Sequence, residues 1–96
     1  MQFLLVAYDA NDDDALARRM AAREAHLELV KVNQAKGHAK FGAALIEDGK
    51  MIGSMMGVDY PDRDALDAWL NEEPYVTGKV WDEISISECK IAPSFS

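Results

Sequence analysis

The sequence predicts an α+β domain in which four strands and two helices follow one another in the order β-α-β-β-α-β. Three observations carry this prediction: an apolar, strand-like run at the N-terminus, a long helical segment after it, and an Asp-Gly pair between two further strand-like runs. A second helical segment and a final alternating strand complete the order. Two helices and four strands are enough for a domain of two layers.

The first strand is expected over residues 2–8, where nearly every residue is apolar. A strand that is apolar at both alternating positions is buried on both faces. The acidic residues 9–14 end this strand and supply an Asp or Asn as the N-cap of a helix. We expect that helix to run from about Asp13 to about Lys36, with Gly37 as its C-terminal stop.

Residues 40–46 and 50–60 form the next two strand-like runs, separated by Glu47-Asp48-Gly49. Asp-Gly at this position predicts a hairpin, because glycine adopts positive φ without strain. Pro61-Asp62 then opens the second helix. Glu73-Pro74 ends it, since the residue before a proline is disfavoured in the helical region.

Residues 74–78 read as a turn or a single helical turn. The alternation Ile84-Ser85-Ile86-Ser87 has a period of two and indicates a last strand within residues 80–91. The complete order is that of the ferredoxin-like split βαβ arrangement, with two helices on one face of a four-stranded antiparallel sheet.

Composition limits the partners of this chain. Its 96 residues predict one domain, residues 1–96, and the net charge of −7 disfavours nucleic acid and anionic membranes, which both require basic surface. The longest apolar run, residues 3–7, is far shorter than a membrane span. A single cysteine, Cys89, cannot form an internal disulfide, so we expect a cytoplasmic protein.

The apolar residues on both faces of the sheet predict that the protein associates with another copy of itself. Two helices can cover only one face, yet the first strand is apolar on both faces. The methionines Met51, Met55 and Met56 are also spread over both faces of the third strand. Another copy of the same sheet is the simplest cover for the open face. We therefore expect a homodimer packed sheet to sheet.

One stripe of the first helix stands out as a place for chemistry. Arg19, Arg23 and His26 are three and four residues apart, so a helix places them side by side on its surface. The stripe borders an apolar row that we expect to be buried, which would place the stripe at the edge of the buried face. That row consists of Leu16, Met20, Leu27 and Val30.

The sequence also resembles the YCII-related family over nearly its whole length. The resemblance rests on residues 3–9 (FLLVAYD), 19–27 (RMAAREAHL) and 49–54 (GKMIGS), and on Pro74-Tyr75-Val76 with the following Gly78. It implies a ferredoxin-like dimer of the dimeric α+β barrel type. It also implies a site that pairs the helix histidine, His26, with the acid of an Asp-Pro-Tyr turn, which here reads Glu73-Pro74-Tyr75.

The leading hypothesis from these residues is an enzyme that transfers protons on a small anionic organic molecule, as a lyase, an isomerase or a dehalogenase-like enzyme. His26 would be the base or acid, because its unperturbed pKa lies near neutral pH. Glu73 would orient it, with Asp59 at the end of the third strand as a competing partner. Arg23 would hold a substrate carboxylate.

Further candidates complete this site. Arg19 is a second substrate-binding candidate, although both arginines could instead pair with acids at residues 12–14 or with Glu72. Tyr75 would line a pocket, and Ser54 would form a hydrogen-bonding wall of it. The histidine spacing matches no metal site and no phosphate-binding glycine loop is present, so no cofactor is expected.

The alternative hypothesis is a non-catalytic dimer that binds a ligand or a partner. Glu73 in place of the family's Asp favours this alternative, since an extra methylene moves the carboxylate. The basic stripe in an otherwise acidic protein favours the enzyme.

Overall fold

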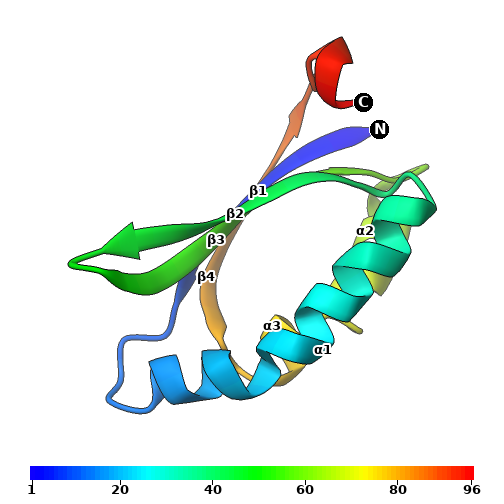
Figure 1. The fold of residues 1–96 in the computed structure, drawn as a ribbon. Coiled ribbons are helices and arrows are strands. Elements are labelled where there is room, and N and C mark those ends of the chain that lie inside the picture. Colours follow the sequence, from blue (N-terminus) through cyan, green and yellow to red (C-terminus); the bar gives the residue numbers. More distant parts are fainter.

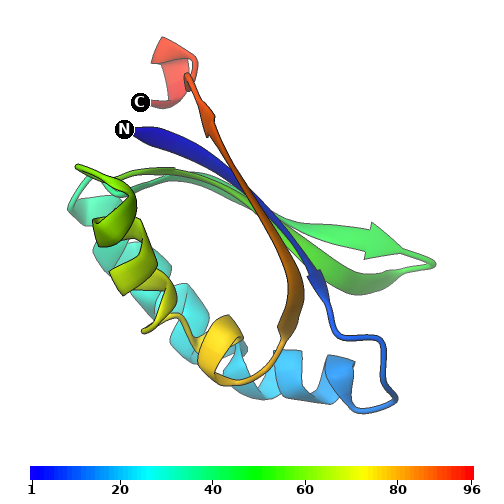
Figure 2. The ribbon, with the colours of Figure 1, turned by 180° about the vertical axis from the view of Figure 1, so that it is seen from behind.

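Four strands form one antiparallel sheet with the spatial order β2-β3-β1-β4. The computed structural model describes residues 1–96, and Figures 1 and 2 show the helices on one side of a strongly bent sheet. The elements are β1 (Gln2–Asp9), α1 (Ala15–Ala35), β2 (Ala39–Glu47), β3 (Lys50–Asp59), α2 (Arg63–Leu70), α3 (Pro74–Thr77), β4 (Trp81–Cys89) and a final 3-10 turn, η1 (Pro93–Phe95). The predicted α+β, ferredoxin-like order is confirmed.

The element boundaries follow local signals in the sequence. At the β2–β3 turn, Asp48 has φ 51° and Gly49 has φ 76°, which are the values that a two-residue hairpin requires. Helix α2 begins after Asp62, whose side chain accepts a hydrogen bond of 2.8 Å from the N–H of Ala65. It ends at Leu70, three residues earlier than the expected end at Glu73.

The start of α1 differs in detail from the expectation. Asp14 occupies the N-cap position, but its side chain makes no capping hydrogen bond. The carboxylate of Asp12 instead accepts a 2.9 Å hydrogen bond from the N–H of Asp14. At the other end, Gly37 follows the helix with φ 81°, as expected for a C-terminal stop.

The buried face of α1 is the main correction to the sequence-based picture. The residues of the apolar row at 16, 20 and 27 are exposed by 39%, 51% and 43% respectively. Arg19 and His26, which are polar, are instead buried at 2% and 8% exposure. Small or apolar residues such as Ala15 and Leu29 fill the rest of this face. Polar side chains can be buried here because each finds a charged partner on another element, as described below.

The core lies between the sheet and the helices. Along β1, Phe3, Leu5 and Ala7 point toward the helices and are buried. They pack with Leu66 and Trp69 of α2 and with the side chains around α3. No helix in the structure is long and apolar enough to cross a membrane.

The opposite face of the sheet carries apolar side chains that no helix covers. Leu4 and Val6 of β1, Met55 of β3 and Phe41 of β2 occupy this face and remain partly exposed. The ring of Phe41 lies over Gly57, where a Cβ atom would come within 2.2 Å of it. This surface is called the outer face below.

Candidate active site

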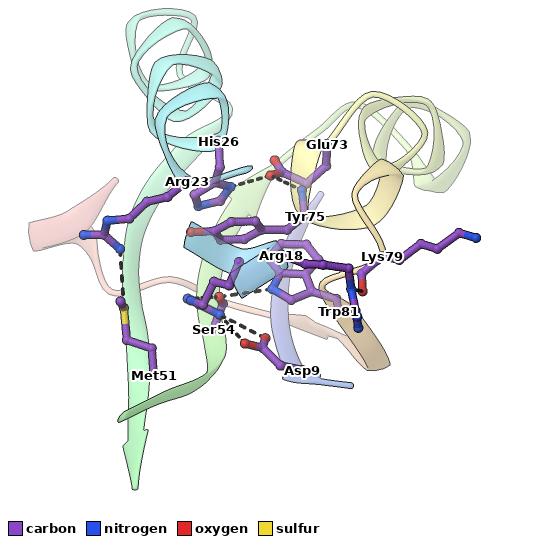
Figure 3. Close-up of polar contacts among 11 residues, drawn as sticks. Asp9, Arg18, Arg23, His26, Met51, Ser54, Glu73, Tyr75, Lys79 and Trp81 are labelled. Atoms are coloured by element: carbon purple, nitrogen blue, oxygen red, sulfur yellow. Dashed lines mark hydrogen bonds and ion pairs between the residues drawn. The ribbon is translucent and has the colours of Figure 1, made fainter. Parts of the chain in front are cut away.

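His26 and Glu73 meet beneath the sheet, although they lie 47 residues apart in the sequence. His26 projects from the middle of α1, and Glu73 immediately precedes α3. The Nδ1 atom of the imidazole contacts Oε1 of the carboxylate, and Glu73 is fully buried at 0% exposure (Figure 3). An ionised carboxylate only accepts hydrogen bonds, so Nδ1 carries the proton in this contact.

The same carboxylate is the N-cap of α3. Its Oε1 accepts a hydrogen bond of 3.3 Å from the N–H of Tyr75. Pro74 favours the start of a helix at this point, because its fixed φ suits the first helical position and it has no N–H to satisfy. The Glu-Pro-Tyr sequence therefore fixes where the carboxylate lies and where the tyrosine ring begins.

The Tyr75 ring is held by aromatic and cationic neighbours. It stacks on the His26 ring with centroids 3.9 Å apart and planes inclined by 14°. The guanidinium carbon of Arg19 lies 4.7 Å from the ring centroid, and Trp81 meets the ring edge-on at 5.6 Å. Burial raises the pKa of the Tyr75 hydroxyl, and the positive charges of Arg19 and Arg23, together with the N–H donors of Arg23 beside it, oppose that shift.

Below the ring lies a buried network around Arg19. One guanidinium nitrogen donates to both carboxylate oxygens of Asp9, at 2.9 and 3.1 Å. The other donates to the hydroxyl of Ser54 at 2.9 Å, and Trp81 donates to the same hydroxyl at 3.1 Å. Desolvation raises the pKa of Asp9, although the hydrogen bond and charge of Arg19 act in the opposite direction.

Arg23 lies one helical turn beyond Arg19 and has a different environment. It is half-buried, and its guanidinium contacts the sulfur of Met51 at 3.4 Å. No carboxylate pairs with it, whereas the expected acidic cluster binds a third arginine: Arg18 contacts both oxygens of Asp12, at 2.9 and 2.8 Å. The charge of Arg23 thus remains available.

These side chains surround a cavity of about 190 Å³ between α1 and the strands β2 and β3. Its polar lining consists of Arg19, Arg23, His26, Ser54 and Tyr75. No carboxylate lines it, since Asp9 and Glu73 lie behind Arg19 and His26. The lining is therefore rich in hydrogen-bond donors and positive charge.

The structure brings six of the seven candidate residues together: Arg19, Arg23, His26, Ser54, Glu73 and Tyr75. It does not bring Asp59 to the site. The carboxylate of Asp59 accepts a hydrogen bond from Gln2 at 3.4 Å and does not contact His26. Asp59 is the last residue of β3, whereas Glu73 directly precedes α3, which packs against α1 and brings this carboxylate to the histidine.

Sequence reasoning missed Asp9 and the second role of Trp81. The sequence predicts Asp9 only as one of the acidic residues 9–14 that end the first strand, and it gives no sign that Trp81 donates a hydrogen bond to Ser54. The signal for Asp9 was the register of β1: residues 3, 5 and 7 face the helices, and residue 9 continues that alternation. No group of three or more His, Cys, Asp or Glu side chains is arranged to hold a metal ion.

The sequence model of the YCII-related domain matches residues 1–90. This chain belongs to the YCII-related family. The resemblance noted in the sequence is thereby confirmed. No curated protein sequence matches the chain significantly.

Solved structures of the same fold share little sequence with this YCII-related protein. The 5-chloro-2-hydroxyhydroquinone dehydrochlorinase of Burkholderia phenoliruptrix AC1100, in complex with 2,5-dihydroxybenzoquinone, superposes with a TM-score of 0.81 at 18% identity, over 100% of both chains. An antibiotic biosynthesis monooxygenase has a TM-score of 0.55 at 12% identity, covering 97% of this chain and 100% of that one. A dimeric ferredoxin-like protein of unknown function from Jannaschia sp. CCS1 has a TM-score of 0.53 at 14% identity, covering 94% and 98%. At these identities the likeness concerns the fold.

Proposed function

We propose that this protein is a small enzyme that moves a proton on a small anionic organic molecule, with His26 as the base. The observation that carries the proposal is the buried contact between His26 and Glu73 at the wall of a cavity whose other polar side chains are all donors and whose remaining lining is apolar. A titratable group beside a carboxylate in a cleft is a recurring feature of proton-transfer sites.

The roles of the two residues follow from their contact. Glu73 holds the Nδ1–H tautomer of His26 and stabilises the imidazolium that forms when the ring gains a second proton. The free nitrogen, Nε2, is then the atom that accepts a proton from a bound molecule. Stacking on Tyr75 fixes the plane of the imidazole.

The cavity defines the class of substrate. Its volume of about 190 Å³ limits the ligand to a small molecule. Arg23 supplies an unpaired guanidinium suited to a two-point grip on a carboxylate. Arg19 is already occupied by Asp9 and Ser54, so it adds positive charge and positions its neighbours.

The proposed reaction begins at a carbon next to a carbonyl group. The C–H bond breaks, its proton moves to Nε2 of His26, and its electron pair forms a new double bond. Either a leaving group departs with its electron pair from the neighbouring carbon, or the proton returns at another carbon. The first course is that of a lyase or dehalogenase-like enzyme and the second is that of an isomerase. The dehydrochlorinase with the same fold supports the first course.

Hydrogen–deuterium exchange tests the proposal without knowledge of the natural reaction. A panel of small carboxylates with an acidic C–H next to a carbonyl is incubated in D₂O, and loss of the C–H signal is followed by NMR. We expect the wild type to accelerate exchange of at least one member. His26→Gln should lower that rate by about 10²- to 10⁴-fold.

The matched control is His38→Gln, because His38 is the second histidine and its Nδ1 hydrogen-bonds the backbone oxygen of Asp59 instead of the site. Its exchange rate should match the wild type. If no compound exchanges faster with wild type than with His26→Gln, the catalytic proposal is wrong. The non-catalytic dimer would then be favoured. Glu73 contacts His26 although its side chain is one methylene longer than the family's Asp, and this contact supports the enzyme over the non-catalytic dimer.

We further propose that two copies pack through the outer face in a cytoplasmic homodimer. The partly exposed residues Leu4, Val6 and Met55 support this assembly, and the Jannaschia protein of the same fold is described as dimeric. Val6→Glu should convert the dimer to a monomer in sedimentation equilibrium. Ala21→Glu, which adds the same charge on exposed helix surface, should leave the dimer intact. A wild-type monomer would rule the assembly out.

A further inference from the structure

The O–H proton of Tyr75 has no acceptor in the protein, although the residue is only 1% exposed; the Arg23 guanidinium beside it can only donate. A buried hydroxyl without a partner is unfavourable, and the large majority of such groups in native proteins are paired. Tyr75 also lines the cavity beside His26. An acceptor that is bound in the cavity would supply the missing partner.

The ring cannot turn its hydroxyl to another partner. His26 stacks on it at 3.9 Å, the Arg19 guanidinium lies 4.7 Å from its centroid, and Trp81 abuts it edge-on. Figure 3 shows the hydroxyl end of the ring on the side where Arg23 lies. Tyr75 is therefore a rigid donor whose direction is set before any ligand binds.

Ser54 provides a second donor in the same cavity. Its oxygen accepts hydrogen bonds from Arg19 at 2.9 Å and from Trp81 at 3.1 Å. A hydroxyl has two acceptor lone pairs and one O–H proton, so both lone pairs are occupied. The O–H proton of Ser54 can then only donate, and Ser54 lies in the cavity wall.

We propose that the hydroxyl of Tyr75, with that of Ser54 as a second donor, binds the oxygen on which negative charge develops when His26 removes the substrate's proton. The inference rests on the proposed function and defines its substrate class as enolisable carbonyl compounds. As the C–H bond breaks, its electron pair forms a C=C bond and the C=O pair moves onto oxygen. The proton goes to Nε2 of His26, and Tyr75 keeps its own proton while hydrogen-bonding the oxyanion.

The physical advantage is that the donors are already in place when negative charge develops on the substrate oxygen in the transition state. Donors that are fixed before the reaction need no reorganisation when the oxyanion forms, so they stabilise it more than they stabilise the neutral carbonyl. Burial raises the pKa of the Tyr75 hydroxyl, which keeps it protonated and able to donate. Arg23 adds positive charge on the same side of the cavity.

Tyr75→Phe tests the inference, because it removes the donor and keeps the ring that stacks on His26. The probe for affinity is 2,5-dihydroxybenzoquinone, a planar molecule whose anions spread charge over oxygen atoms. We expect its Kd to rise by about tenfold or more, since a hydrogen bond to a charged oxygen is lost. The control is Tyr8→Phe, which removes an exposed hydroxyl outside this cavity and should leave the Kd unchanged.

Two further readouts separate a catalytic role from a structural one. The midpoint of thermal unfolding should stay or rise in Tyr75→Phe, because an unpaired buried hydroxyl has gone. The kcat of C–H exchange should fall by about 10²- to 10³-fold, with a smaller change in KM.

The possible failures are distinct. If exchange depends on His26 but is unchanged in Tyr75→Phe, this inference is overturned and the proposed function stands. A wild type that catalyses no exchange refutes the proposed function itself. A wild type that does not bind the probe, or a Tyr75→Phe variant that binds it equally well or is markedly destabilised, overturns the oxyanion role.

Discussion

Replacing Arg19 by methionine should strongly destabilise the fold. The side chains of Arg19 and Asp9 are exposed by only 2% and 6%, and two hydrogen bonds of 2.9 and 3.1 Å join them. The variant leaves the Asp9 carboxylate buried without its countercharge. Loss of one partner from a buried ion pair destabilises a protein by about 3–5 kcal/mol. A domain of this length has a total stability of roughly 5–14 kcal/mol, so the loss is about a fifth of it or more.

Urea unfolding at pH 7 measures this loss, and a neighbouring arginine supplies the control. Arg18 also makes a two-point contact with a carboxylate, that of Asp12, but the side chains of this pair are 31% and 53% exposed. Water and salt screen such a pair, so Arg18→Met should change the unfolding free energy little. The same substitution at adjacent positions thus isolates the effect of burial.

A double variant tests the cause. Asp9→Leu combined with Arg19→Met removes both charges, and replacement of a buried pair by apolar side chains is often neutral or stabilising. The double variant should therefore recover most of the stability lost in Arg19→Met alone. A loss below about 1 kcal/mol for Arg19→Met, or no recovery in the double variant, would refute the reasoning.

Two other predictions concern titration and backbone packing. Carboxyl NMR should place the pKa of Asp9 above 3.8 because of burial, and that of Asp12 below 3.8 because of its hydrogen bond from Arg18. The contribution of Asp9 to stability is then fully present below pH 3.8 and is lost as pH rises through the folded-state pKa of Asp9. The contribution of Asp12 is present above pH 3.8 and is lost as pH falls through the folded-state pKa of Asp12. The reverse order of the two midpoints would contradict both assignments. Gly53→Ala should lower the unfolding free energy by about 1–3 kcal/mol, because the added Cβ would lie 2.5 Å from a backbone oxygen of β1. An unchanged urea midpoint would show that the two strands shift apart at no cost in stability.

The order of elements could be predicted because the local signals agree with the fold. Asp48-Gly49 does form the hairpin turn, and Asp62 does cap α2. The alternation in β4 is equally direct, since Ile86 packs against the core. Each of these signals acts over a few residues, so no knowledge of the tertiary structure is needed to read it.

The inward face of α1 could not be predicted in this way. Apolar residues usually mark the buried side of a helix, and that rule favours Leu16, Met20 and Leu27. The actual choice depends on Asp9 and Glu73, which supply charged partners for Arg19 and His26. One partner lies 10 residues away and the other 47, so local periodicity carries no information about them.

Only part of the candidate site could be predicted from the sequence, for the same reason. The stripe of basic residues on one helix follows from spacing alone, and the pairing of His26 with Glu73 was implied by the resemblance to the YCII-related family. The sequence could not predict that the Tyr75 O–H lacks an acceptor, because this depends on which groups every neighbouring side chain already binds.

A single oxygen atom of Glu73 sets the positions of two functional groups. Oε1 contacts Nδ1 of His26 and accepts the backbone N–H of Tyr75. A displacement of this carboxylate would therefore disturb both contacts at once. The geometry of the site therefore depends on the position of this one carboxylate oxygen.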